Sequence, residues 1–115
     1  MTQRVIEFRG KTRISNRWIF GNVILGKDHA NIYPVDSNTD YEVKPDTVGQ
    51  FTGLNDKHGN KIFEGDIVRH NKLGVFSAEF KDGSFRMGIV LLNFFHKEIE
   101  VIGNIFDNPE LINNA

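Results

Sequence analysis

Residues 75–92 read VFSAEFKDGSFRMGIVLL, and this stretch decides the fold class. Apolar and polar residues alternate on both sides of Asp82-Gly83, a pattern typical of two antiparallel strands. An Asp-Gly pair favours a two-residue type I′ turn, because both central residues of that turn need positive φ. The stretch therefore predicts a β-hairpin with strands at Val75–Phe80 and Ser84–Leu92.

Short alternating segments, separated by Gly, Asn and Asp, continue this pattern along the chain. They predict a strand pair or a bulged strand over Lys61–His70 and further strands at Arg4–Phe8, Trp18–Leu25, His29–Val35, Val48–Leu54 and Glu98–Phe106. Within Trp18–Leu25, Gly21-Asn22 predicts a break by a turn or a bulge. The polar, acidic residues 36–46 predict a loop. Asn108-Pro109-Glu110 predicts a helix start capped by Asn108, with room for a single turn. The expected fold class is mainly β, with short antiparallel strands and a minor C-terminal helix turn.

The second half of the chain predicts a small barrel. Residues 60–106 hold several short strands joined by tight turns, and curling so small a sheet removes most of its edges. We therefore expect an SH3-like or complex small barrel in this half. With 115 residues, the chain has the length of one domain. The prediction is a single domain over residues 1–115. A subdivision of this domain would be an N-terminal β subdomain over 1–54 that packs on a C-terminal barrel over 55–115.

Composition excludes several kinds of chemistry. The chain has no cysteine, so disulfides, thiolate zinc sites, iron–sulfur clusters and thiol nucleophiles are excluded. Small secreted domains usually depend on disulfides, so this composition favours a reducing compartment. The N-terminal residues lead into no apolar signal segment, and no stretch approaches the ~20 apolar residues of a membrane span. We expect a cytoplasmic protein that does not associate with membranes.

Charge is distributed unevenly although the net charge is only −1. Residues 1–17 contain five cations against Glu7, and these are Arg4, Arg9, Lys11, Arg13 and Arg17. Residues 28–46 contain five acids against Lys44. One interpretation is that the two segments neutralise each other within the fold or across a subunit interface. The other is that the five basic residues contact the phosphates of a nucleic acid, although strong nucleic-acid binders usually have a clearly basic domain.

Four pieces of the chain carry a family resemblance. They are Phe8-Arg9-Gly10 followed by Asn16–Gly21, then Val48–Val68, Val75–Phe85 and Glu100–Leu111. The most specific is the second, VGQFTGLNDKHGNKIFEGDIV. In these pieces, which cover about two thirds of the chain, the sequence resembles the YopX family of phage and prophage proteins. The resemblance implies a phage or prophage origin, a bacterial host and a mostly β fold, and it implies no activity.

Two acidic motifs within this resemblance are candidates for catalytic or metal sites. In the segment 56–60, Asp56 can bond the backbone two residues on, and Gly59 can adopt the left-handed conformation of a hairpin loop. Glu64-Gly65-Asp66 places two acids two residues apart, which suits acid–base catalysis only if burial separates their pKa values. We interpret both motifs as turns, with Asp66 accepting backbone N–H bonds. The chain is therefore predicted to have no catalytic, cofactor-binding or metal-binding residue.

The adjacent aromatic residues Phe94 and Phe95 are the best sequence indication of a contact surface. Most of the ten phenylalanines lie at alternating apolar positions and are expected to fill the core. Adjacent residues of a strand point to opposite faces, so either Phe94 or Phe95 should point outward. The leading hypothesis is a non-enzymatic accessory protein that self-associates or binds a host protein through Phe94 and Phe95. The alternative is a nucleic-acid-binding module that uses the basic N-terminal residues.

Overall fold

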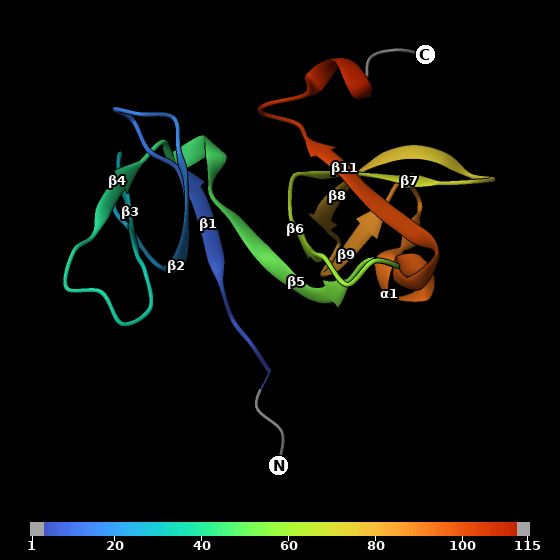
Figure 1. Cartoon of the computed structure of the whole chain (residues 1–115), viewed down its shortest axis with the longest axis horizontal. Coiled ribbons are helices and arrows are strands. Elements are labelled where there is room, and N and C mark those ends of the chain that lie inside the picture. Colours follow the sequence, from blue (N-terminus) through green and yellow to red (C-terminus); the bar gives the residue numbers. More distant parts are fainter. Residues whose placement is uncertain (1–3, 113–115) are drawn as a thin grey trace. The chain divides into compact units, whose positions relative to one another are not determined.

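The computed structural model of the chain describes residues 4–112 and divides into two compact units (Figure 1). Unit 1 ends at Phe51, and unit 2 begins at Thr52. Strand β5 (Gly49–Asn55) passes from the first unit into the second. Both units consist of antiparallel strands, which confirms the mainly β fold class. The subdivision at residues 54 and 55 stays a prediction.

In unit 1, four strands form a sheet that closes on itself. They are β1 (Phe8–Lys11), β2 (Trp18–Leu25), β3 (Ala30–Tyr33) and β4 (Tyr41–Val43), and each pairs antiparallel with the next. The chain just after β1 returns to β4, where Thr12 pairs with Val43. The backbone N–H of Lys44 also donates to the carbonyl of Lys11 at 2.8 Å. This closure surrounds a core made of Ile19, Ala30, Ile32 and Val43.

A glycine makes this closure possible. A Cβ at Gly10 would lie only 2.8 Å from Cγ2 of the buried Val43, so a larger residue in β1 would displace that core side chain. The 3₁₀ turn η1 (Pro45–Thr47) follows β4, and the Oγ1 of Thr47 accepts the N–H of Lys11 at 2.9 Å. The start of β5 then pairs with β1, with Gly49 opposite Arg9.

Unit 2 contains an antiparallel sheet in the order β10-β9-β8-β7-β11. Its strands are β7 (Asp66–His70), β8 (Gly74–Lys81), β9 (Ser84–Met87), β10 (Val90–Leu91) and β11 (Ile99–Asn104), and the short β6 (Lys61–Phe63) precedes them. The sheet has its two edges at β10 and β11, so the strand pairings of the described residues do not close a barrel here. The SH3-like character of this half stays a prediction.

The hairpin predicted around Asp82-Gly83 is confirmed. Lys81 pairs with Ser84, and the two turn residues have φ of 53° and 82°, which are the positive values that a type I′ turn requires. The second predicted strand is wrong in length. It ends at Met87 because Gly88 adopts φ of 63°, and the chain restarts as β10 after the almost fully exposed Ile89.

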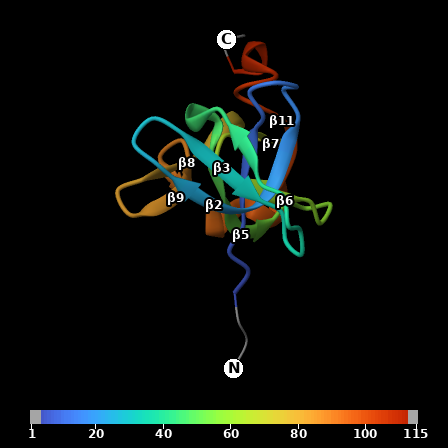
Figure 2. The ribbon, with the colours of Figure 1, turned by 90° about the vertical axis from the view of Figure 1, so that its left-hand side faces the viewer.

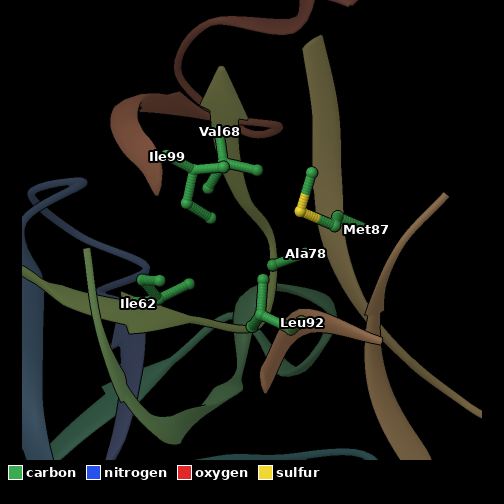
Figure 3. Close-up of a cluster of buried hydrophobic side chains, with 6 residues drawn as sticks. All are labelled: Ile62, Val68, Ala78, Met87, Leu92 and Ile99. Carbon is green, nitrogen blue, oxygen red and sulfur yellow. The ribbon is translucent and has the colours of Figure 1, made fainter. Parts of the chain in front are cut away.

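The core of unit 2 collects side chains from most of its elements (Figure 3). Leu92 enters this core from the short helix α1 (Leu92–Phe95). The members of the cluster are Ile62, Val68, Ala78, Met87, Leu92 and Ile99, each no more than 1% exposed. Burying a leucine or isoleucine contributes about 1.5–3 kcal/mol, so this cluster is the main source of stability in the unit.

Three other predictions of local structure need correction. Residues 36–46 are not only a loop, since β4 lies within them. The first strand begins at Phe8, where the prediction of Arg4–Phe8 ends. Pro109 does start a single turn, the 3₁₀ turn η3 (Pro109–Leu111), but the side chain of Asn108 does not cap it. The Oδ1 of Asn108 instead accepts the N–H of Asn104 at 3.2 Å, which holds the end of β11.

Candidate interaction surface

Phe94 and Phe95 lie on helix α1, where the sequence predicted a strand. In a helix, residues three apart share a face, so Phe95 lies on the same side as the buried Leu92 and Phe94 points away. Phe95 packs against the core cluster, whereas the Phe94 side chain is 69% exposed. The expectation that one of the two points outward is therefore met, although by helical rather than strand geometry. Their role in an interface stays a prediction.

A shallow hollow lies beside α1 in unit 2. Its volume is about 390 Å³, and it is lined mostly by apolar atoms of Thr52, Leu54, Ser84, Phe85, Leu91 and Asn93. Asn93 is the neighbour of Phe94 in α1, and Leu91 belongs to the edge strand β10. An exposed aromatic side chain next to an apolar hollow and a sheet edge offers a surface on which a protein can bury apolar area.

The segment that follows Phe94 is held in place by the buried His70. The Nδ1 of His70 accepts the backbone N–H groups of Lys72 and Leu73, both at 3.1 Å. Since Nδ1 is an acceptor, the ring proton of the neutral imidazole is on Nε2, which lies 3.2 Å from a carboxylate oxygen of Glu98. The His70 ring also meets the ring of Phe95 edge-on at 5.7 Å. Glu98 belongs to the 3₁₀ turn η2 (His96–Glu98), so His70 connects the β7–β8 turn to the α1–η2 segment.

Asp56 organises a hairpin loop, as the sequence predicts. Its Oδ1 accepts the N–H groups of His58 and Asn60, both at 2.9 Å, and Gly59 has a φ of 84°. Its Oδ2 accepts the N–H of Val101 at 2.9 Å, next to the bulge in β11 between Val101 and Gly103. Burial raises the pKa of Asp56, but the hydrogen bonds from Val101, Asn60 and His58 outweigh burial and hold that pKa below its ordinary value.

Asp66 of the second motif also bonds the backbone. Asp66 is buried, and its Oδ2 accepts the N–H of Phe63 at 2.7 Å, as expected for a turn before a strand. On the exposed side of β7 and β11, Glu100 binds the guanidinium of Arg69, and its other oxygen lies 3.4 Å from His58. The hydrogen bond from Arg69 lowers the pKa of Glu100, although partial desolvation opposes the shift. These acids are accounted for by structural partners.

Among residues 4–112, no group of three or more His, Asp or Glu side chains is arranged to hold a metal ion. The histidines of unit 2 have separate partners, and the Nδ1 of His96 lies 2.7 Å from the carbonyl of Asn55. Within the same described range, no helix has the length and apolar character that a membrane crossing requires. The prediction that the chain has no catalytic, cofactor-binding or metal-binding residue stays a prediction.

The five basic residues of the N-terminal segment do not share one surface environment. Arg4 and Arg17 are exposed, whereas Arg9 is buried with its guanidinium 4.6 Å from the centre of the Trp18 ring. The Nζ of Lys11 lies 5.7 Å from the same ring. Arg13 pairs with Glu42 at 3.2 Å. The Arg13–Glu42 pair joins the basic and acidic segments within unit 1. Such pairing within the fold is what one of the two interpretations of their opposite charges predicts.

Sequence reasoning found no aromatic partner for these cations and missed Trp18. The signal was available, because Arg9 and Lys11 are two residues apart and so share a strand face. Only the register between β1 and β2 places Trp18 on that face, because Trp18 pairs with Lys11 and lies diagonally opposite Arg9.

The model of the YopX protein family matches residues 7–113 of this chain, which is nearly its whole length. The chain belongs to the YopX family. A solved structure, that of protein EF1440 from Enterococcus faecalis, is similar to this family member with a TM-score of 0.62. The match is 24% identical and covers 96% of this chain and 99% of that chain, and it supports the fold alone. No curated protein matches this YopX-family chain.

Proposed function

We propose that this chain is a phage- or prophage-encoded accessory protein that acts in the bacterial cytoplasm by binding proteins, its own copies included, and that it catalyses no reaction. The observation that carries the proposal is the 69% exposure of Phe94 on α1, the helix whose Asn93 lines the apolar hollow of unit 2. The absence of cysteine and the family membership support the cytoplasmic and phage-related parts.

Phe94 has the properties of an interface anchor. Phenylalanine loses little conformational entropy on burial, and burying it contributes about 1.5–3 kcal/mol. The backbone of α1 is fixed by the burial of Leu92 and by the packing of Phe95 against the core cluster and the His70 ring. The exposed ring of Phe94 therefore lies on an ordered segment. A preorganised aromatic side chain beside a hollow is the arrangement found at energetically dominant positions of protein interfaces. We assign as its partner a protein surface that offers apolar side chains.

The best candidates for catalytic groups are engaged elsewhere, which favours binding over catalysis. Asp56 and Asp66 both accept backbone N–H bonds, and the buried His70 uses both ring nitrogens within the fold. A general base needs a lone pair directed at a substrate, and in these three residues the polar atoms are directed at the backbone or at Glu98.

The test is affinity capture from bacterial lysate with the tagged full chain, with and without nuclease and at moderate salt. We expect a protein partner that survives nuclease treatment and whose recovery falls about tenfold or more for Phe94→Ala, because one anchor of about 1.5–3 kcal/mol is removed. Ile89→Ala is the matched control, since Ile89 is 94% exposed in the same unit but does not belong to α1.

Two outcomes would overturn the proposal. In the first, capture by Phe94→Ala equals capture by the unaltered chain. In the second, only nucleic acid is recovered, it disappears on nuclease treatment, and binding weakens steeply with salt. The second outcome, together with loss of binding in Arg4→Ala and Arg17→Ala, would assign the protein to the nucleic-acid-binding class.

A further inference from the structure

Unit 1 displays a fully exposed isoleucine on an ordered loop. Ile14 is 99% exposed and lies in the β1–β2 loop, residues 12–17, which we name the basic loop. Thr12 holds this loop from within: its Oγ1 accepts the N–H groups of Ser15 and Arg17 at 3.3 and 3.1 Å. The N–H of Asn16 donates to the carbonyl of Thr12 at 3.1 Å. These bonds hold the backbone of the loop in a conformation in which Ile14 lies in solvent.

The surroundings of Ile14 are basic and partly apolar. Arg13 and Arg17 flank it in sequence, and the Nζ of Lys44 donates to the Oδ1 of Asn16 at 2.6 Å. A small hollow of about 130 Å³ adjoins the loop and is lined by Thr12, Arg13, Ile14, Ser15, Tyr41 and Glu42. Tyr41 is 38% exposed. Glu42 pairs with Arg13 at this hollow, so the remaining positive charge of the rim belongs to Arg17 and Lys44. The basic loop therefore presents an apolar centre with a rim of net positive charge.

The β3–β4 loop, residues 34–40, has the opposite character, and we name it the acidic loop. Val35 is 69% exposed at its start, and Asp36 and Asp40 are also exposed. The loop is ordered by its own bonds, since the N–H of Ser37 donates to the carbonyl of Pro34 at 3.1 Å and Asp40 accepts the side-chain amide of Asn31 at 2.6 Å. It therefore presents an apolar centre with a negatively charged rim.

The two loops lie at opposite ends of unit 1. In Figure 1 and in Figure 2 the basic loop, in blue, is at the top of the unit, and the acidic loop, in teal, is toward its lower end. Within one copy, Arg13 of the basic loop pairs with Glu42 of β4, whereas Asp36 and Asp40 of the acidic loop are exposed. The two surfaces are complementary in charge and both have an apolar centre, so each has a matching surface on a second copy.

We propose that copies of this chain associate head to tail, with Ile14 and the basic loop of one copy seated against Val35 and the acidic loop of the next. This inference specifies the self-association within the proposed function, and it uses a surface separate from Phe94. Such a contact is heterologous, so it leaves one free surface of each kind on a dimer and continues into a ring or an open chain of copies. Its charged rim makes the association stronger at low salt.

The test is analytical ultracentrifugation of two full-length variants, alone and mixed. One variant, Ile14→Asp with Arg17→Glu, has an altered basic loop. The other, Val35→Lys with Asp36→Asn, has an altered acidic loop; asparagine tolerates the φ of 62° that Asp36 adopts. We expect the unaltered chain to form concentration-dependent assemblies at about 100 μM, at least about tenfold more tightly at 0.05 M than at 0.5 M salt.

Each variant alone should be monomeric, while their equimolar mixture should form a discrete dimer and nothing larger, because only one intact pair of surfaces remains. Ile89→Asp, which alters an equally exposed isoleucine in unit 2, should assemble like the unaltered chain. A monomeric unaltered chain, variants that assemble normally, or a mixture that stays monomeric would each overturn the inference. Phe94→Ala should leave this assembly unchanged, so failure of the proposed Phe94 surface and failure of head-to-tail association are distinguishable.

Discussion

The basic loop of unit 1 and the Asp56 loop of unit 2, residues 56–60, are built with the same device, and both are exposed beyond a buried first residue, but they differ in how that residue bonds to the rest of its unit. In each, an oxygen of the first residue's side chain accepts two backbone N–H groups of the loop, from Ser15 and Arg17 or from His58 and Asn60. Asp56 has a second oxygen, which accepts the N–H of Val101 in β11, and the N–H of Lys57 donates to the carbonyl of Ile99. The hydroxyl of Thr12 has no second oxygen of this kind.

This difference separates a structural loop from a displayed one. The second carboxylate oxygen ties the Asp56 loop to a strand more than 40 residues away, so the loop becomes part of the framework of unit 2. The single hydroxyl of Thr12 bonds locally. The contacts of its loop with a distant segment come from other residues, the N–H of Arg13 to the carbonyl of Glu42 and Lys44 to Asn16, and they leave Ile14 in solvent. Order in a loop therefore does not by itself indicate whether the loop stabilises the fold or serves as a contact surface.

Removing the carboxylate of Asp56 should have the largest effect on stability. Asp56→Ala leaves three backbone N–H groups without their acceptor, of which that of Val101 belongs to a half-buried residue, and we expect the free energy of unfolding to fall by about 3 kcal/mol. Chemical denaturation of the full chain, with hydrogen exchange at the Val101 amide, measures this. Lys57→Ala in the same loop is the control and should change stability by less than about 0.5 kcal/mol. An equal effect of both substitutions would show that the carboxylate does not organise the loop.

Acid should loosen the Asp56 loop before the basic loop. The pKa of Asp56 is lower in the folded chain than its unfolded value of about 4, so its contribution is complete above that pH and is lost as the pH falls through the folded pKa. Glu100 shifts in the same direction, so the difference between the unaltered chain and Asp56→Asn isolates the contribution of Asp56. Unfolding measured from pH 7 downward should show this difference shrinking below about pH 4. A difference that stays constant to pH 2 would contradict the assignment.

Thr12→Val should have a smaller effect, confined to unit 1. The substitution keeps the shape of the side chain and removes the acceptor for Ser15 and Arg17, so we expect a loss of about 1–2 kcal/mol. Thr39→Val, at an exposed position of the acidic loop, is the matched control and should be nearly neutral. Hydrogen exchange at the Arg17 amide reports the loop directly, and unchanged protection there would argue against the role of Thr12.

The smallest effect on stability is expected for Ile14→Asp. The side chain of Ile14 is outside the core, so the free energy of unfolding, measured by thermal unfolding, should change by less than about 0.5 kcal/mol. Head-to-tail association should nevertheless be lost. A stability loss of 2 kcal/mol or more would mean that Ile14 is buried in the solution state. That result would make the basic loop a structural element like the Asp56 loop.

Local patterns predicted the elements whose geometry depends on near neighbours. The bounds of β2 were predicted residue for residue, although the break predicted at Gly21-Asn22 is wrong, since the strand pairs through both residues. The Asp82-Gly83 turn has the two positive φ values that its sequence requires. The turn role of Asp56 also followed from the sequence, because an aspartate two residues before an N–H donor closes a local ring. The distant bond from Asp56 to Val101 had no local signal, since 45 residues separate the partners.

The failures occurred where a distant partner determines the conformation. Strand β4 has three residues, of which only Val43 is buried, so no apolar alternation marks it. It exists because β3 pairs with it on one side and Thr12 on the other. Helix α1 was missed because the apolar run Ile89–Leu92 followed by Phe94-Phe95 suits a strand or a buried helix equally.

The sequence by itself determined the mainly β class, the hairpin of unit 2, the absence of thiol chemistry and the YopX family, because each depends on composition or on residues close in the chain. Tertiary structure alone decided that the closed sheet is in unit 1, that Arg9 is buried against Trp18, and that Phe94 rather than Phe95 is exposed. Closure, burial and exposure depend on which distant segments meet, and the free energy of those contacts is not encoded in any short stretch of residues.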